Sequence, residues 1–137
     1  MRDGIVVDKT KDNVTPVQNP LRILGVYAHP DDETLCVGGT LAKYAAMGAH
    51  ILIVSATRGE AGQIRDTQVA TRATLGQTRA LELRHACERL GVSQVMCFDY
   101  GDGKLMSVDR GPLAAQLTQI IRQFRPDVVL TFGDGCL

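Results

Sequence analysis

The sequence predicts an α/β fold in which helices cover both faces of a parallel sheet. Four short apolar runs alternate along the chain with three stretches whose apolar residues recur at helical spacing. This alternation implies parallel strands joined by right-handed crossovers, and 137 residues with 45% apolar content suffice for one such domain. If the first three strands step outward and the fourth returns beside the first, the strand order is 3-2-1-4. A binding crevice is then expected between strands one and four.

The first strand and helix are predicted from an apolar run that is followed by an Ala-rich helical stretch. Residues 22–28 form the strand, and residues 34–47 form the helix, which Gly48 ends as a C-terminal cap. Gly38 and Gly39 each weaken that helix by about 1 kcal/mol relative to Ala. We therefore expect the start of the helix to pack closely against the sheet or the site.

The middle of the chain adds a second strand, a long loop and a second helix. Residues 50–57 are a continuous apolar run of the kind that buried parallel strands use. The polar stretch 63–74 is predicted to be a long loop with some helix, and such loops often line a site. Residues 77–90 are amphipathic, which predicts a helix that Gly91 stops.

The last third of the chain repeats this pattern. Residues 93–98 are the third predicted strand, and the loop at 99–103 is too acidic and glycine-rich to be buried. Apolar residues at helical spacing predict a helix over 113–124. Residues 127–132 are the fourth strand. The loops after the first and fourth strands are expected to face each other across the crevice.

Composition narrows the functional classes. The formal net charge is zero, so nothing indicates a nucleic-acid or membrane surface. No apolar run is long enough for a membrane span and no signal peptide is found, so a cytoplasmic location is expected. The polar residues 1–20 are interpreted as a leader to a domain at 21–137. The four cysteines lack CxxC spacing and are predicted to be reduced thiols, mostly in the core.

One short segment concentrates the chemistry. Residues 29–33, His-Pro-Asp-Asp-Glu, place an imidazole and three carboxylates in the turn between the first strand and the first helix. Like charges this close disfavour joint ionisation, and a divalent cation would relieve that cost. His29 and Asp32 have the spacing to share one ion such as Zn²⁺, while Asp31 can act as a general base on a metal-bound water. The alternative is that these residues cap the helix, and both roles can coexist.

Six motifs in order along the chain carry a family resemblance. They are residues 28–33, 38–42, 57–62, 79–82, 90–92 and 125–129. This series resembles the PIG-L/LmbE family of zinc-dependent deacetylases of N-acetylglucosamine-type sugars. The resemblance implies a Rossmann-like sheet, with His29 and Asp32 as zinc ligands and Asp31 as the base that activates the zinc-bound water. It also implies that Arg79 and Asp102 hold the sugar.

The residues implied to hold the sugar have plainer alternatives. Arg79 lies on an amphipathic helix, where it could belong to a solvated face or pair with Glu82 or Asp66. Asp102 precedes a glycine and could be an ordinary turn residue. Glu60, in the loop beside the site, could support either the site or the fold.

The chain departs from the family pattern after its fourth strand. Relatives continue into a second His-Pro-Asp-His segment, which supplies the third zinc ligand and a further catalytic histidine, whereas only two ligands can be counted in this sequence. A truncated chain or a fragment of a longer protein accounts for this most simply. Alternatively, Cys136 supplies a thiolate ligand, or another chain completes the site.

The function expected from these observations is zinc-dependent hydrolysis of the N-acetyl group of an N-acetylglucosamine-type conjugate, which releases acetate and a free amine. Another divalent metal could replace zinc, and homo-oligomers are compatible with the sequence. The competing hypothesis is a catalytically incomplete fragment, or a degenerate α/β module that binds a sugar without the third metal ligand. A Rossmann dehydrogenase is a poorer alternative, because the first turn carries His-Pro-Asp-Asp where the glycine fingerprint belongs.

Overall fold

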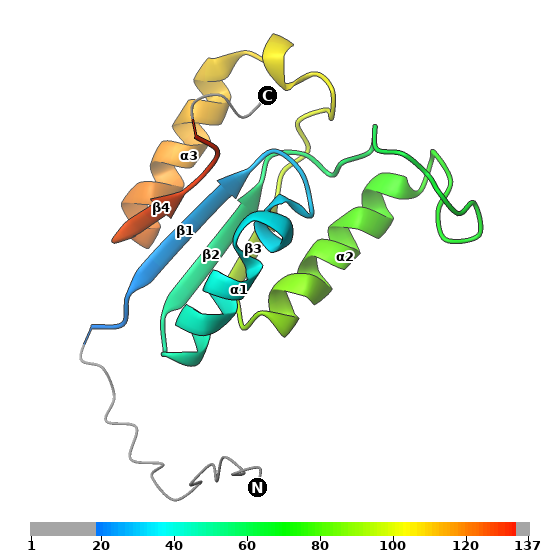
Figure 1. Ribbon diagram of the computed structural model, residues 1–137. Helices are drawn as coiled ribbons and strands as arrows, with labels where there is room; N and C mark the ends of the chain where they lie inside the picture. The colour runs from blue at the N-terminus through cyan, green and yellow to red at the C-terminus, as the bar shows by residue number, and fades with distance from the viewer. Residues whose placement is uncertain (1–18, 134–137) are drawn as a thin grey trace, which may run out of the picture.

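A parallel sheet of four strands, in the order β3-β2-β1-β4, forms the centre of the molecule (Figure 1). The structure, a computed structural model, describes residues 19–133. It confirms the predicted α/β fold and the predicted strand order. The strands are β1 (Arg22–Tyr27), β2 (His50–Ser55), β3 (Gln94–Cys97) and β4 (Val128–Leu130), and the helices are α1 (Asp32–Ala46), α2 (Leu75–Arg89), the 3₁₀ helix η1 (Leu105–Ser107) and α3 (Arg110–Phe124).

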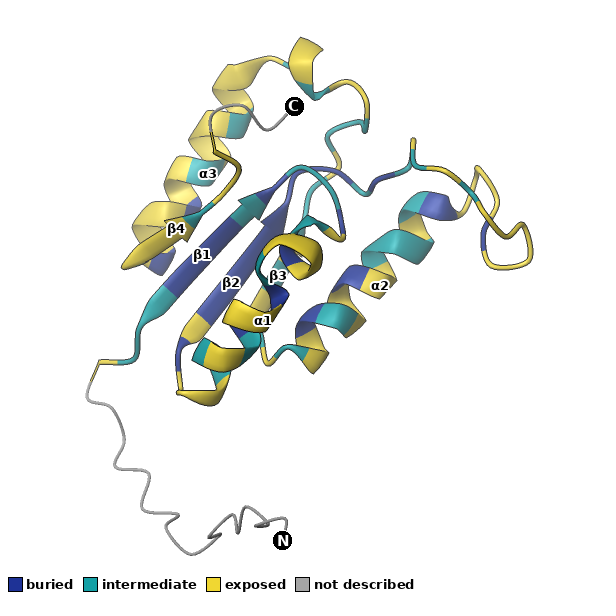
Figure 2. Ribbon diagram, in the orientation of Figure 1, coloured by how far each residue is buried: buried dark blue, intermediate teal, exposed yellow. Residues whose placement is uncertain are grey.

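The helices form one layer on each face of the sheet. Helices α1 and α2 cover one face and α3 covers the other (Figure 1). Along β1, Ile23 packs in the layer of α1 and α2, whereas its neighbour Leu24 packs against α3. Strand β2 alternates in the same way between the two layers, and its residues after His50 are all buried (Figure 2). This double burial explains why its sequence is a continuous apolar run.

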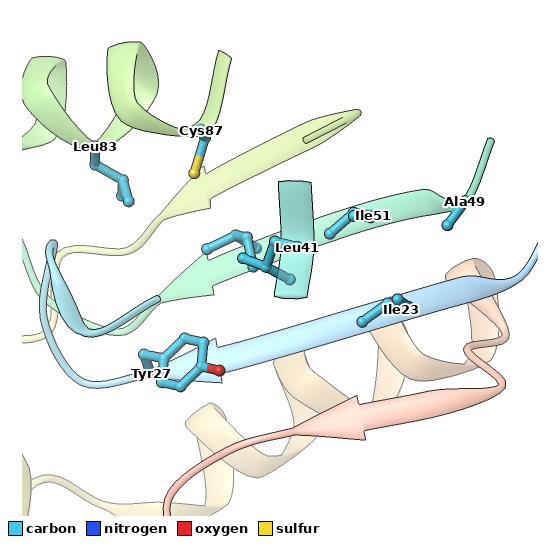
Figure 3. Close-up of a cluster of buried hydrophobic side chains, with 8 residues drawn as sticks. Ile23, Tyr27, Leu41, Ala49, Ile51, Leu83 and Cys87 are labelled. Atoms are coloured by element: carbon cyan, nitrogen blue, oxygen red, sulfur yellow. The ribbon is translucent and has the colours of Figure 1, made fainter. Parts of the chain in front are cut away.

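Leu41 lies at the centre of the layer between α1, α2 and the sheet. Figure 3 shows it above β2, in a cluster that also contains Leu83 and Cys87 of α2. Its side chain is fully buried. The packing of α1 on the sheet therefore depends more on Leu41 than on the exposed apolar residues of this helix.

Replacing Leu41 with Ala is expected to lower the free energy of unfolding by about 3 kcal/mol, because the lost methyl groups leave a cavity in a packed layer. Urea denaturation monitored by circular dichroism measures this change. Leu35→Ala is the matched control, since Leu35 lies on the same helix and is 79% exposed. Equal destabilisation by the two substitutions would contradict the packing described above.

The helix boundaries differ from the predicted ones at the N-terminal ends. Helix α1 begins at Asp32, two residues earlier than predicted, and α2 begins at Leu75, also two residues earlier. Helix α3 begins at Arg110 and includes Pro112 in its first turn, where a backbone amide has no helical partner to lose. Apolar periodicity marks the middle of a helix well but does not identify its polar first turn.

The prediction of some helix in the long loop 63–74 was wrong. These residues form turns. Asp66 Oδ1 accepts a hydrogen bond from the Gln68 amide at 2.8 Å, and Thr74 Oγ1 accepts one from the Thr71 amide at 2.9 Å. Such side chain to backbone bonds offer the chain an alternative to helical pairing.

The close packing predicted for Gly38 and Gly39 occurs at a different place. A Cβ on Gly38 would lie 3.8 Å from Leu90 at the end of α2, so the glycine faces α2 rather than the sheet or the site. A Cβ on Gly39 would meet nothing within 4 Å. The partner was mispredicted because helix to helix contacts are not encoded in local sequence.

Burial of the cysteines follows the prediction in part. The three described cysteines are free: Cys87 is buried, Cys97 is half-buried and Cys36 is exposed on α1. Burial raises the pKa of the Cys87 thiol to about 12, which keeps it protonated. Cys136 and most of the predicted leader lie outside the described residues. Of the helices in the described part of the chain, none is long and apolar enough to cross a bilayer.

Candidate active site

The loops that follow β1, β2 and β3 meet at the carboxyl edge of the sheet. The amide of Thr57 donates to Ala28 O at 3.0 Å, and the amide of Tyr100 donates to Ala56 O at 3.2 Å, so each loop continues the pairing of the strands before it. The five predicted site residues come from these loops, from the first residue of α1 and from α2. The predicted partner loop after β4 lies mostly beyond residue 133, where the structure describes nothing.

His29 lies between two carboxylates. Its Nδ1 is 3.5 Å from Asp32 Oδ2, and its Nε2 is 2.9 Å from Asp102 Oδ1. An imidazole that donates its Nε2 proton to Asp102 keeps a lone pair on Nδ1 and presents it toward Asp32. Because the side chain of His29 is 39% exposed, this pair of atoms can be reached from solvent.

The pair formed by His29 Nδ1 and Asp32 Oδ2 fits a tetrahedral zinc ion. Bonds of about 2.0–2.2 Å at a tetrahedral angle place two ligand atoms about 3.4 Å apart, and the two atoms here are 3.5 Å apart. Asp102 contacts the other ring nitrogen of His29, as a carboxylate that orients a metal-ligating histidine does. Within residues 19–133 there is no group of three or more His, Cys, Asp or Glu side chains that could hold a metal. Among the described residues, two atoms therefore have a spacing that suits a zinc ion, and no third ligand accompanies them.

Asp102 is much less exposed than its loop composition predicted. Its side chain is only 9% exposed, so the prediction of an exposed loop was wrong for this residue. Its Oδ2 accepts a hydrogen bond from the Ala61 amide at 2.9 Å, and its own amide donates to Glu60 Oε1 at 2.8 Å. The carboxylate is drawn inward because His29 and a backbone amide satisfy it there. Glu60, whose role was left open, supports this loop.

Replacing Asp102 with Asn is expected to weaken zinc binding by about 10–100-fold, because the amide cannot supply the negative charge that holds and polarises His29. Calorimetric titration of zinc into the metal-free protein measures the affinity. Asp99→Asn is the matched control on the same loop, since Asp99 is exposed and pairs with Arg58. An unchanged affinity in Asp102→Asn would exclude the orienting role.

Asp31 pairs with a residue of α2 rather than with His29. Its Oδ2 accepts a hydrogen bond from Arg79 Nη2 at 3.0 Å, while its side chain remains 55% exposed. Arg79 thus pairs with Asp31, and neither Glu82 nor Asp66, the partners considered from the sequence, forms an ion pair with it among the described residues. Asp31 occupies the N-cap position of α1 but makes no side-chain cap bond. Helix capping therefore does not explain why an acid is found at this position.

Arg79 and Asp102, to which the resemblance assigns sugar binding, both lie at the site. Arg79 donates to the backbone carbonyl oxygens of Gly59 and Pro30 as well as to Asp31. Asp102 contacts His29 and the Ala61 amide. Sugar binding by these two residues stays a prediction. Sequence reasoning missed their contacts within the protein because each contact joins segments that are far apart in the chain.

Residues 24–136 match the PIG-L family, which is described as GlcNAc-PI de-N-acetylase. The chain belongs to the PIG-L family. Among PIG-L relatives, the 1D-myo-inositol 2-acetamido-2-deoxy-alpha-D-glucopyranoside deacetylase of Thermobifida fusca is 38% identical over 85% of this chain and 48% of its own length. The protein of the same name from Thermobispora bispora is 37% identical over 83% of this chain and 45% of its own length. The chain thus spans about half the length of these relatives.

Two solved structures share the fold of this chain. The N,N′-diacetylchitobiose deacetylase of Pyrococcus horikoshii has a TM-score of 0.70 and 29% identity, covering 87% of this chain and 43% of its own. The 4-carboxy-2-hydroxymuconate hydratase of Pseudomonas putida has a TM-score of 0.67 and 30% identity, covering 80% of this chain and 45% of its own. The predicted family is confirmed, and the similar structures include both a deacetylase and a hydratase.

Proposed function

We propose that this chain carries the base and two metal ligands of a zinc-dependent N-deacetylase. Its substrate is an N-acetylglucosamine-type conjugate of low molecular weight, and its products are acetate and a free amine. The observation that carries the proposal is the 3.5 Å approach of His29 Nδ1 and Asp32 Oδ2, with Asp102 bound to the other imidazole nitrogen. Asp31, the neighbour of Asp32 in the chain, adds a carboxylate that is 55% exposed. The deacetylase names of the relatives support it.

Each residue of the site has a separate role in the proposed reaction. His29 and Asp32 would hold Zn²⁺, which when bound polarises the acetamide carbonyl and lowers the pKa of water. Asp102 keeps the imidazole in the orientation and tautomer that leave Nδ1 unprotonated. Asp31 accepts the proton of the attacking water as a general base. The water oxygen bonds to the carbonyl carbon, the C–N bond breaks, and the proton leaves on the amine.

The third zinc ligand is expected from outside residues 19–133. Cys136, one of the candidates, lies outside the described residues. The other candidates are further residues of a longer protein and a residue of another chain. Zinc rather than another divalent ion, a homo-oligomeric state and a cytoplasmic location all stay predictions.

The test combines metal binding with product analysis. Acetate release is measured from 1D-myo-inositol 2-acetamido-2-deoxy-alpha-D-glucopyranoside and from N,N′-diacetylchitobiose, before and after chelation and with zinc restored. The expected result is acetate release that chelation abolishes and zinc restores. Sugar binding that is independent of zinc and gives no acetate would support the degenerate binding module instead. Water addition to 4-carboxy-2-hydroxymuconate without amide hydrolysis would assign the chain to the hydratase type.

A further inference from the structure

The backbone of Asp31 is strained. Its φ of 113° lies in the region that glycine favours, and Arg125 is the only other non-glycine residue of 19–133 with positive φ. A residue with a Cβ adopts such a conformation only where its surroundings hold it there. The groups that contact Asp31 therefore determine where its carboxylate points.

Arg79 holds Asp31 from the side of α2. Its Nη2 donates to Pro30 O, the carbonyl of the peptide that precedes Asp31, at 2.6 Å, and to Asp31 Oδ2 at 3.0 Å. Its Nη1 donates to Gly59 O at 2.8 Å. One guanidinium thus fixes the peptide and the carboxylate of Asp31 and ties both to the loop after β2. The side chain of Arg79 is only 18% exposed. Its bonds to the two backbone carbonyls are partly buried, whereas its bond to the Asp31 carboxylate lies at the surface.

Glu33 binds the backbone amide of Asp31. Its carboxylate is buried, with Oε2 accepting the Asp31 amide at 3.2 Å and Oε1 accepting the Thr34 hydroxyl at 2.6 Å. The amide of Asp31, the carbonyl before it and one carboxylate oxygen therefore all have partners. This set of contacts over-determines the position of Asp31, as its strained backbone requires.

The loop after β2 is shaped around the guanidinium of Arg79. Gly59 has a φ of 67°, and a Cβ at this position would overlap Arg79 Nη1. A Cβ on Gly62 would lie 2.9 Å from the same nitrogen. Two glycines are thus needed for Arg79 to reach the carbonyls that it binds. The absence of a Cβ at Gly59 and Gly62 leaves space for the guanidinium that binds Asp31.

We propose that Arg79 is a positioning residue, which holds the strained backbone of Asp31 and aims its carboxylate at the reacting water. This inference rests on the proposed function, in which Asp31 is the general base. It differs from sugar binding, which needs guanidinium donors directed at substrate rather than at three protein oxygens. Lysine cannot replace Arg79, because a single ammonium group does not reproduce the planar fork that bridges these acceptors.

The structural test measures the backbone of Asp31 in the 137-residue chain. The three-bond NMR coupling between the amide and Hα protons of Asp31 reports its φ. We expect this coupling to change in Arg79→Ala and Arg79→Lys toward the value of a negative φ. Arg72→Ala is the matched control, because Arg72 Nη1 donates to Glu60 O and Gly62 O of the same loop but does not contact Asp31. If the amide–Hα coupling of Asp31 is the same in folded Arg79→Lys as in the unsubstituted protein, the proposal is overturned. Arg79→Lys alone decides the test if Arg79→Ala does not fold.

The kinetic test separates positioning from sugar binding. In the acetate-release assay, Arg79→Lys is expected to lower kcat by about 100-fold, the effect of misplacing a catalytic group by about 1 Å, with KM nearly unchanged. A raised KM with an unchanged kcat would overturn the proposal in favour of sugar binding. If the unsubstituted protein releases no acetate, the proposed function fails, whereas the NMR measurement still decides whether Arg79 holds Asp31.

Discussion

Replacing Asp31 with Asn is expected to lower kcat for acetate release by about 10²–10⁴-fold, the usual contribution of a general base. The amide oxygen of Asn can still accept the hydrogen bond of Arg79, but it cannot take a proton from water. Zinc affinity should stay close to that of the unsubstituted protein, because Asp31 faces Arg79 rather than the ligand pair of His29 and Asp32.

The rate of acetate release under saturating zinc and substrate measures this effect. Asp99→Asn removes an exposed carboxylate from a nearby loop and should leave the rate unchanged. Full activity in Asp31→Asn would show that another group accepts the proton. A parallel loss of zinc would instead place Asp31 among the metal ligands.

Replacing Asp32 with Asn is expected to weaken zinc binding by at least about 10³-fold, more than the loss of a residue that only orients a ligand. Asp32 Oδ2 accepts the amide of His29 at 2.9 Å, and the oxygen of Asn can keep this bond. The turn should therefore survive while the anionic ligand is lost.

Competition with a chromogenic chelator measures this affinity. Asp102→Asn provides the graded comparison, because it should cause a smaller loss than Asp32→Asn. Equal zinc affinity in Asp32→Asn and the unsubstituted protein would mean that the ion binds elsewhere. Unfolding curves of both variants establish that the turn before α1 is intact.

The fold could be predicted from sequence because its signals are local. The continuous apolar run of β2 reports burial on both faces, and alternation with helices fixes parallel pairing. His29, Asp31 and Asp32 could be found because they are neighbours in the chain, directly after a buried strand. Their grouping does not depend on any distant contact.

The supporting contacts of the site could not be predicted because they join distant segments. Composition suggested that Asp102 is exposed, but His29 and the Ala61 amide bind its carboxylate and account for its burial. Helical spacing offered Glu82 as a partner for Arg79, whereas the folded chain brings Asp31 to it. Pairs of this kind are determined by tertiary structure, which local rules do not describe.

The strand that precedes the turn at residues 28–31 is bonded on both sides. Strand β1 pairs along its whole length with β2 and also pairs with β4. Its amide protons should therefore exchange with solvent only through large-scale opening of the domain, whereas those of the turns at 63–74 should exchange quickly. The spacing of His29 and Asp32 is then preorganised before any ligand arrives, because the turn that holds His29 starts from a strand that is paired on both sides.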